Sequence, residues 1–92
     1  MKATEKVQKI RSELMILEAL VVAMERREEV FAVLEESEND QQTRLFLGER
    51  LGLDEVQIRA ILDMQIRRFT PTNRRMIEEH IAVLDHELGA LG

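Results

Sequence analysis

The stretch Leu53–Thr70, LDEVQIRAILDMQIRRFT, decides the fold of this chain. Asp54 is a good helix N-cap, and Gln57 three residues later completes the spacing of a capping box, so a helix is predicted over residues 54–68. Its apolar residues lie on more than one face, and they are Val56, Ile58, Ala60, Ile61, Leu62, Met64 and Ile66. A helix with this pattern is covered on two sides. One side can face its own chain, and we expect the other to face a second chain.

The next helix begins at the pair Thr70-Pro71. The residue before a proline is pushed out of the helical region, whereas proline itself suits the first turn of a helix. A last helix is therefore predicted over residues 71–91, and a first helix of ~45 Å over residues 6–35. Both carry apolar residues at steps of three and four, which predicts two seams that pair in an antiparallel coil. The seam residues are Val7, Ile10, Leu14, Leu17, Val21, Met24, Ile77, Ile81, Leu84 and Leu88.

Between the two arms, residues 35–40 contain four carboxylates and no apolar side chain, which indicates an exposed connection. The alternation and the glycine of a calcium-binding loop are missing from it. A short helix over about 41–50 follows, with Gly52 as its C-terminal stop. The sequence thus predicts one all-α domain over residues 1–92, a long antiparallel two-helix coiled coil capped by a small helical bundle. The arms span about 6–30 and 71–91, and the globular tip about 31–70.

The composition narrows the class of protein. The 92 residues are 45% hydrophobic and 34% charged, as in a folded helical domain. A net charge of −5 repels a phosphate backbone, so direct DNA binding is expected to be weak or absent. The chain has no cysteine, which excludes disulfides and thiolate metal sites. No apolar run of ~18 residues and no signal peptide occur, so no membrane contact and a cytoplasmic location are the default expectations.

Two blocks resemble the A subunits of bacterial type IIA DNA topoisomerases, the gyrase and topoisomerase IV chains. The first is ILEALVVAMERREEVFAVL over Ile16–Leu34, where the family has an Ile-Leu-Glu-Gly/Ala-Leu opening, then Ala-Leu-Asp and an acidic-Glu-Val step. The second is Arg59–Thr70, which corresponds to the family's Gln-Ala-Ile-Leu-Asp-Met-x-Leu-x-x-Leu-Thr. The second block is the more specific, since any coiled coil carries heptads. The family usually has a hydrophobic residue in place of Arg27 and a glycine in place of Pro71.

The resemblance implies a mechanical role. In the family this region is the exit gate, where two arms meet at their tips and close a ring around the transported duplex. Cleavage in the family uses a tyrosine from another domain and magnesium held by another subunit. This chain has no tyrosine, so it cannot cut DNA alone, and neither enzymatic activity nor a cofactor is expected. A homodimer is expected, or a heteromer with a topoisomerase A subunit. The expected interface residues are Ile58, Ile61, Leu62, Met64, Arg68, Phe69 and Thr70. The chain can be a free-standing paralogue or a piece of a larger subunit.

Other readings of the sequence stay open beside this one. Arg67, Arg68, Arg74 and Arg75 form the basic cluster and are candidate phosphate contacts of a nucleic-acid-contacting helical adaptor, although the pattern is more typical of favourable cations at helix ends. His80 and His86 are six residues apart rather than four, so they lie on different helix faces and predict no metal site. A small all-helical enzyme of chorismate-mutase type is a further alternative. It requires inward-facing arginines or lysines that bind two carboxylates.

Overall fold

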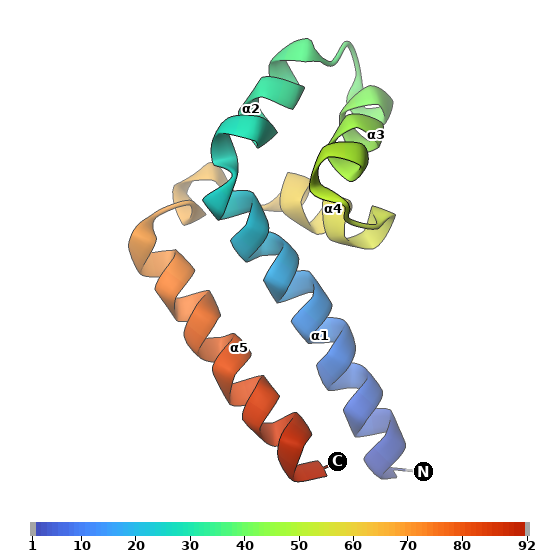
Figure 1. The fold of residues 1–92 in the computed structure, drawn as a ribbon, viewed down its shortest axis with the longest axis vertical. Helices are drawn as coiled ribbons and strands as arrows, with labels where there is room; N and C mark the ends of the chain where they lie inside the picture. Colours follow the sequence, from blue (N-terminus) through green and yellow to red (C-terminus); the bar gives the residue numbers. More distant parts are fainter. Residues whose placement is uncertain (1, 92) are drawn as a thin grey trace.

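The computed structural model describes residues 2–91, and every regular element in that range is helical. The order along the chain is α1 (Lys2–Glu25), α2 (Arg27–Glu36), α3 (Asp40–Leu51), α4 (Glu55–Asp63), a 3-10 turn η1 (Ile66–Arg68) and α5 (Pro71–Leu91). The predicted all-α class is confirmed. Figure 1 shows α1 and α5 side by side with both chain ends at the same end of the molecule, while α2, α3 and α4 gather at the opposite end.

The two long helices bury an apolar cluster between them. Ile10, Leu14 and Leu84 are buried there, and Leu17, Ile81 and Leu88 pack against them. The other expected seam residues lie nearer the two ends of the pair, where Met24 is buried and Val7, Val21 and Ile77 are half-buried. The apolar steps of three and four along both helices thus bring six of the expected seam residues together in one cluster.

The single helix predicted over residues 6–35 is wrong, because the chain divides at Arg26 into α1 and α2. Arg26 has φ −111° and ψ 35°, outside the helical range, and its carbonyl accepts the first hydrogen bonds of α2 from Glu29 and Val30. Neither proline nor glycine marks the break. It comes from packing, because the turn lets α2 lie against α3 and bury Val30 and Val33 in the tip.

The tip is held by one compact core. Its buried members are Ala19, Ala23, Val30, Val33, Leu47, Leu51, Ile58 and Ile61. The two alanines of α1 are fully covered and have no bulky side chain, which lets α4 approach α1 closely. Gln57 strengthens this contact by donating a hydrogen bond from its side chain to the carbonyl of Met15 at 2.9 Å. The tip core therefore joins α1 to the three short helices of the bundle.

Three predicted helix ends are confirmed: the stop of α3 at Gly52 and the starts of α4 and α5. Gly52 ends α3 in the left-handed region at φ 68°, and its N–H donates to the carbonyl of Gly48. The capping box of α4 is complete, because Asp54 accepts from the Gln57 N–H at 2.9 Å and Gln57 accepts from the Asp54 N–H at 3.0 Å. Thr70 caps α5 by accepting from the Asn73 N–H at 3.3 Å. These local signals fix where α4 and α5 begin.

The far end of the helix predicted over residues 54–68 is also wrong. α4 stops at Asp63, the backbone of Met64 and Gln65 is extended, and residues 66–68 form a single 3-10 turn. A helix continued to residue 68 would carry the chain away from α1. The extended pair and the 3-10 turn redirect the chain, so that α5 runs alongside α1 (Figure 1).

Candidate dimerisation surface

We group four apolar side chains of the tip under the name tip patch, and they are Phe31, Leu34, Ile66 and Phe69. The rings of Phe31 and Phe69 lie with their centroids 6.0 Å apart, which places α2 directly beside the segment after η1. Leu34 follows Phe31 by one helical turn, and Ile66 precedes Phe69 by one 3-10 turn, so each lies on the same side as its neighbour. Phe31, Leu34 and Ile66 remain 36%, 43% and 68% exposed.

The structure corrects part of the expected interface. Ile58 and Ile61 are only 1% and 3% exposed and belong to the tip core, so they cannot contact a second chain. Leu62 and Phe69 are partly buried and pack against that core, and Met64 is half-buried. Arg68 and Thr70 are exposed. The segment 54–68 is therefore not sealed from within, but its free apolar side chains differ from those that we expected.

Sequence reasoning missed Phe31, Leu34 and Ile66 as surface residues. Phe31 and Leu34 continue the steps of three and four residues beyond Arg26, so the periodicity alone places them on the seam of one long helix. The turn at Arg26 rotates them out to the surface instead. Ile66 was assigned to α4, whereas it lies in η1. The signal in the sequence for these exposed residues is the number of apolar side chains in the tip, which exceeds the number that its core encloses.

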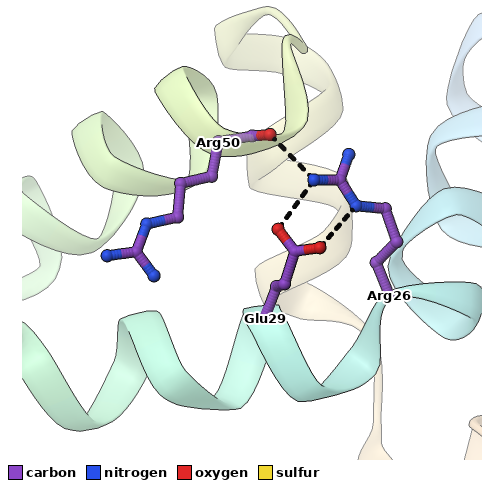
Figure 2. Close-up of polar contacts among 3 residues, drawn as sticks. All are labelled: Arg26, Glu29 and Arg50. Atoms are coloured by element: carbon purple, nitrogen blue, oxygen red, sulfur yellow. Dashed lines mark hydrogen bonds and ion pairs between the residues drawn. The ribbon is translucent and has the colours of Figure 1, made fainter.

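Figure 2 shows the polar contacts that surround the turn at Arg26. The Arg26 guanidinium donates from Nε and Nη2 to both oxygens of Glu29, at 2.9 and 2.7 Å. The same Nη2 donates to the backbone carbonyl of Arg50 near the end of α3, at 3.1 Å. These hydrogen bonds lower the pKa of Glu29 and raise the pKa of Arg26. Both groups therefore remain charged at neutral pH, and the contact joins α2 to α3.

The four arginines of the basic cluster line two separate hollows of the surface. Arg74 and Arg75 line a hollow of about 610 Å³ together with Phe69 and residues 24–29, where α1 passes into α2, and Arg74 pairs with Glu78 at 3.3 Å. Arg67 and Arg68 line a second hollow of about 600 Å³ with Asp63 and Asn73. Glu25, Glu28 and Glu29 also line the first hollow. The hollow therefore carries both positive and negative side chains and is not a purely basic surface.

The structure also bears on the remaining sequence alternatives. Within residues 2–91, Thr43 is the sole buried polar side chain, so no arginine or lysine in that range is buried as a site of chorismate-mutase type would favour. In the same range no three His, Asp or Glu side chains gather closely enough to hold a metal ion. His80 instead lies 3.5 Å from Glu13 of α1. No helix in this range is long and apolar enough to cross a bilayer.

An all-helical module with two antiparallel arms and a partly apolar tip is the class of protein that the fold defines. The family described as the A subunits of DNA gyrase/topoisomerase IV matches residues 1–92. The chain is 38% identical over 85 residues to the DNA gyrase A subunit of Campylobacter jejuni, and 36% identical over 90 residues to that of Mycobacterium tuberculosis. The chain therefore belongs to the family of gyrase and topoisomerase IV A subunits, which confirms the resemblance read from its two sequence blocks.

The comparisons cover almost all of this chain but little of its relatives. The matched regions take in 92% and 98% of this chain, and 10% and 11% of the two gyrase subunits. A third relative, the DNA gyrase A subunit of Brachyspira hyodysenteriae, is 41% identical over 75% of this chain and 8% of its own length. This chain thus corresponds to about a tenth of a gyrase A chain.

Proposed function

We propose that this chain is a non-catalytic homodimerisation module that resembles the exit gate of type IIA topoisomerases. The observation that carries the proposal is the tip patch, in which large apolar side chains from two segments far apart in sequence meet at the surface. Contiguous exposed apolar surface of this kind is typical of sites of protein association. A second copy of the same chain would cover it about a two-fold axis.

The size of the chain is compatible with such an interface. A stable interface takes about 800 Å² from each partner, roughly an eighth of the 6569 Å² accessible surface of this chain. The tip patch would be its apolar centre. The exposed Arg68 and Thr70 and the half-buried Met64 are proposed as part of its rim. In this proposal the pair α1 and α5 is a coiled-coil arm that holds the tip away from any further domain.

The role that we propose is mechanical, because the chemistry of DNA cleavage is missing from this chain. A chain without tyrosine has no phenolic nucleophile to offer. Membership in the topoisomerase family therefore favours a part in closing a gate, and the tip patch is the surface with which it would close.

Sedimentation equilibrium tests the homodimer directly. We expect a species of twice the 10.7 kDa protomer mass as the concentration rises toward about 1 mM. A protomer mass throughout that range would refute the proposal. A titration in which this protein alters the supercoiling rate of a gyrase holoenzyme would support the heteromer with a topoisomerase A chain, and unchanged supercoiling would exclude it.

A further inference from the structure

The elbow between α1 and α2 is fastened by side chains rather than by the backbone alone. Arg26 forks onto Glu29 and reaches the carbonyl of Arg50, while the Arg50 guanidinium extends along α2 to Glu36 at 2.7 Å. The contact of Arg26 with Glu29 lies in the first turn of α2, and the contact of Arg50 with Glu36 lies at the last residue of α2. We call this set of four residues the elbow clamp, and it joins both ends of α2 to the end of α3.

The clamp lies where it controls the tip patch. Phe31 and Leu34 fall between the two fastened residues of α2, Glu29 and Glu36. Phe31 meets Phe69, which belongs to a different segment, so the patch is continuous only while α2 keeps its present direction and rotation. A swing of α2 at Arg26 would separate the two rings and divide the patch.

We propose that Arg26 is a positioning residue whose contacts with Glu29 and Arg50 set the direction of α2, and thereby present the tip patch to a second copy of this chain. The inference rests on the proposed function, because the second copy is the partner. The chemistry suits the role, since a planar guanidinium fixes direction by donating to a carboxylate and a carbonyl together. Partly exposed ion pairs such as these contribute little to overall stability, so their loss should change association more than folding.

The test compares four variants of the full chain by sedimentation equilibrium. Arg26→Gln removes the fork, Arg26→Lys keeps the charge without the fork, and Glu36→Gln releases the far end of α2 alone. Arg59→Gln is the matched control, because it removes an exposed ion pair on α4, with Glu55 at 3.2 Å, outside the clamp. We expect the dimer Kd to rise about tenfold for both Arg26 variants, by less for Glu36→Gln, and to stay unchanged for Arg59→Gln.

A distance measurement tests the positioning itself. The chain has no cysteine, so spin labels can be placed at Ser12→Cys on α1 and Glu35→Cys on α2, both exposed positions. In labelled protein diluted with unlabelled protein, Arg26→Gln should broaden the distance distribution, and Arg59→Gln should leave it as in the parent. The measurement does not require the dimer, so it still tests the elbow if association fails.

The outcomes separate the two proposals. A wild-type dimer whose Kd changes less than twofold in both Arg26 variants and in Glu36→Gln would overturn the inference and leave the proposed function standing. An unchanged distance distribution in Arg26→Gln would also overturn it. If Arg26→Gln fails to fold, Glu36→Gln decides the matter, because a Kd that rises there but not in Arg59→Gln supports the clamp. A wild-type protomer at every concentration removes the proposed function instead.

Discussion

Truncation of Ile66 to alanine is the sharpest test of the tip patch. Ile66 is 68% exposed in the protomer, the highest value among the large apolar side chains of residues 2–91, so it contributes little to the fold of a single chain. If the tip patch is the dimer interface, a partner would remove this side chain from water. The Ile66→Ala variant should therefore keep the fold and weaken the dimer.

The expected magnitude follows from the exposed fraction. Burying a whole isoleucine side chain gains about 1.5–3 kcal/mol, so the exposed two-thirds of Ile66 would gain roughly 1–2 kcal/mol on association. A two-fold dimer contains two copies of the contact, and truncation to alanine would forfeit most of the gain, roughly 2–3 kcal/mol per dimer. That loss corresponds to a rise in Kd of roughly 30- to 150-fold.

Sedimentation equilibrium would measure the change, with Val83→Ala as the control. Val83 is 56% exposed but lies twelve residues into α5, about 18 Å from its start, and so outside the tip patch. Circular dichroism should show the same helix content and melting temperature for both variants. A Kd for Ile66→Ala within threefold of the wild-type value, or an equal effect of Val83→Ala, would refute the assignment of the interface.

Three further outcomes are expected. Leu47→Ala should lower the free energy of unfolding by about 2–5 kcal/mol in urea titrations, because Leu47 is fully buried in the tip core. Gly52→Ala should lower it by about 1–2 kcal/mol in the same assay, since φ 68° is unfavourable for a residue with a Cβ. The pKa of Glu29 is lowered in the folded chain, so its stabilising effect is present above the ordinary glutamate pKa of about 4.3 and is lost as the pH falls through the folded value. Melting curves should therefore show wild-type protein losing more stability between pH 6 and pH 3 than Glu29→Gln does.

The parts of this fold that could be predicted from sequence are those fixed by neighbouring residues. The capping pair Asp54 and Gln57, the stop at Gly52 and the restart at Thr70 each depend on hydrogen bonds or backbone angles within a few residues. Their geometry follows from residue type and spacing alone. For this reason the starts of α4 and α5 and the end of α3 agree with the prediction.

The parts that could not be predicted depend on contacts between distant segments. The break at Arg26 is marked by neither proline nor glycine, and one of the three hydrogen bonds of its side chain goes to the carbonyl of Arg50, twenty-four residues later. The choice of which face of α4 is buried depends on the two alanines of α1 that receive it. Hydrophobic periodicity locates a helical face but does not say whether its own chain or a partner covers that face. The misassignment of Ile58 and Ile61 follows directly from this ambiguity.

The position of the break explains why the apolar surface lies on α2 rather than on α4. An uninterrupted first helix would have kept Phe31 and Leu34 in line with Leu17 and Met24, on the seam that faces α5. The turn at Arg26 instead lets Val30 and Val33, on another face of α2, enter the tip core. Phe31 and Leu34, on the adjacent face of α2, are then left partly exposed, with Phe31 beside Phe69. The side-chain contacts that hold the turn would thus create the surface that we propose for a second copy, which links the elbow clamp to dimerisation through one geometric cause.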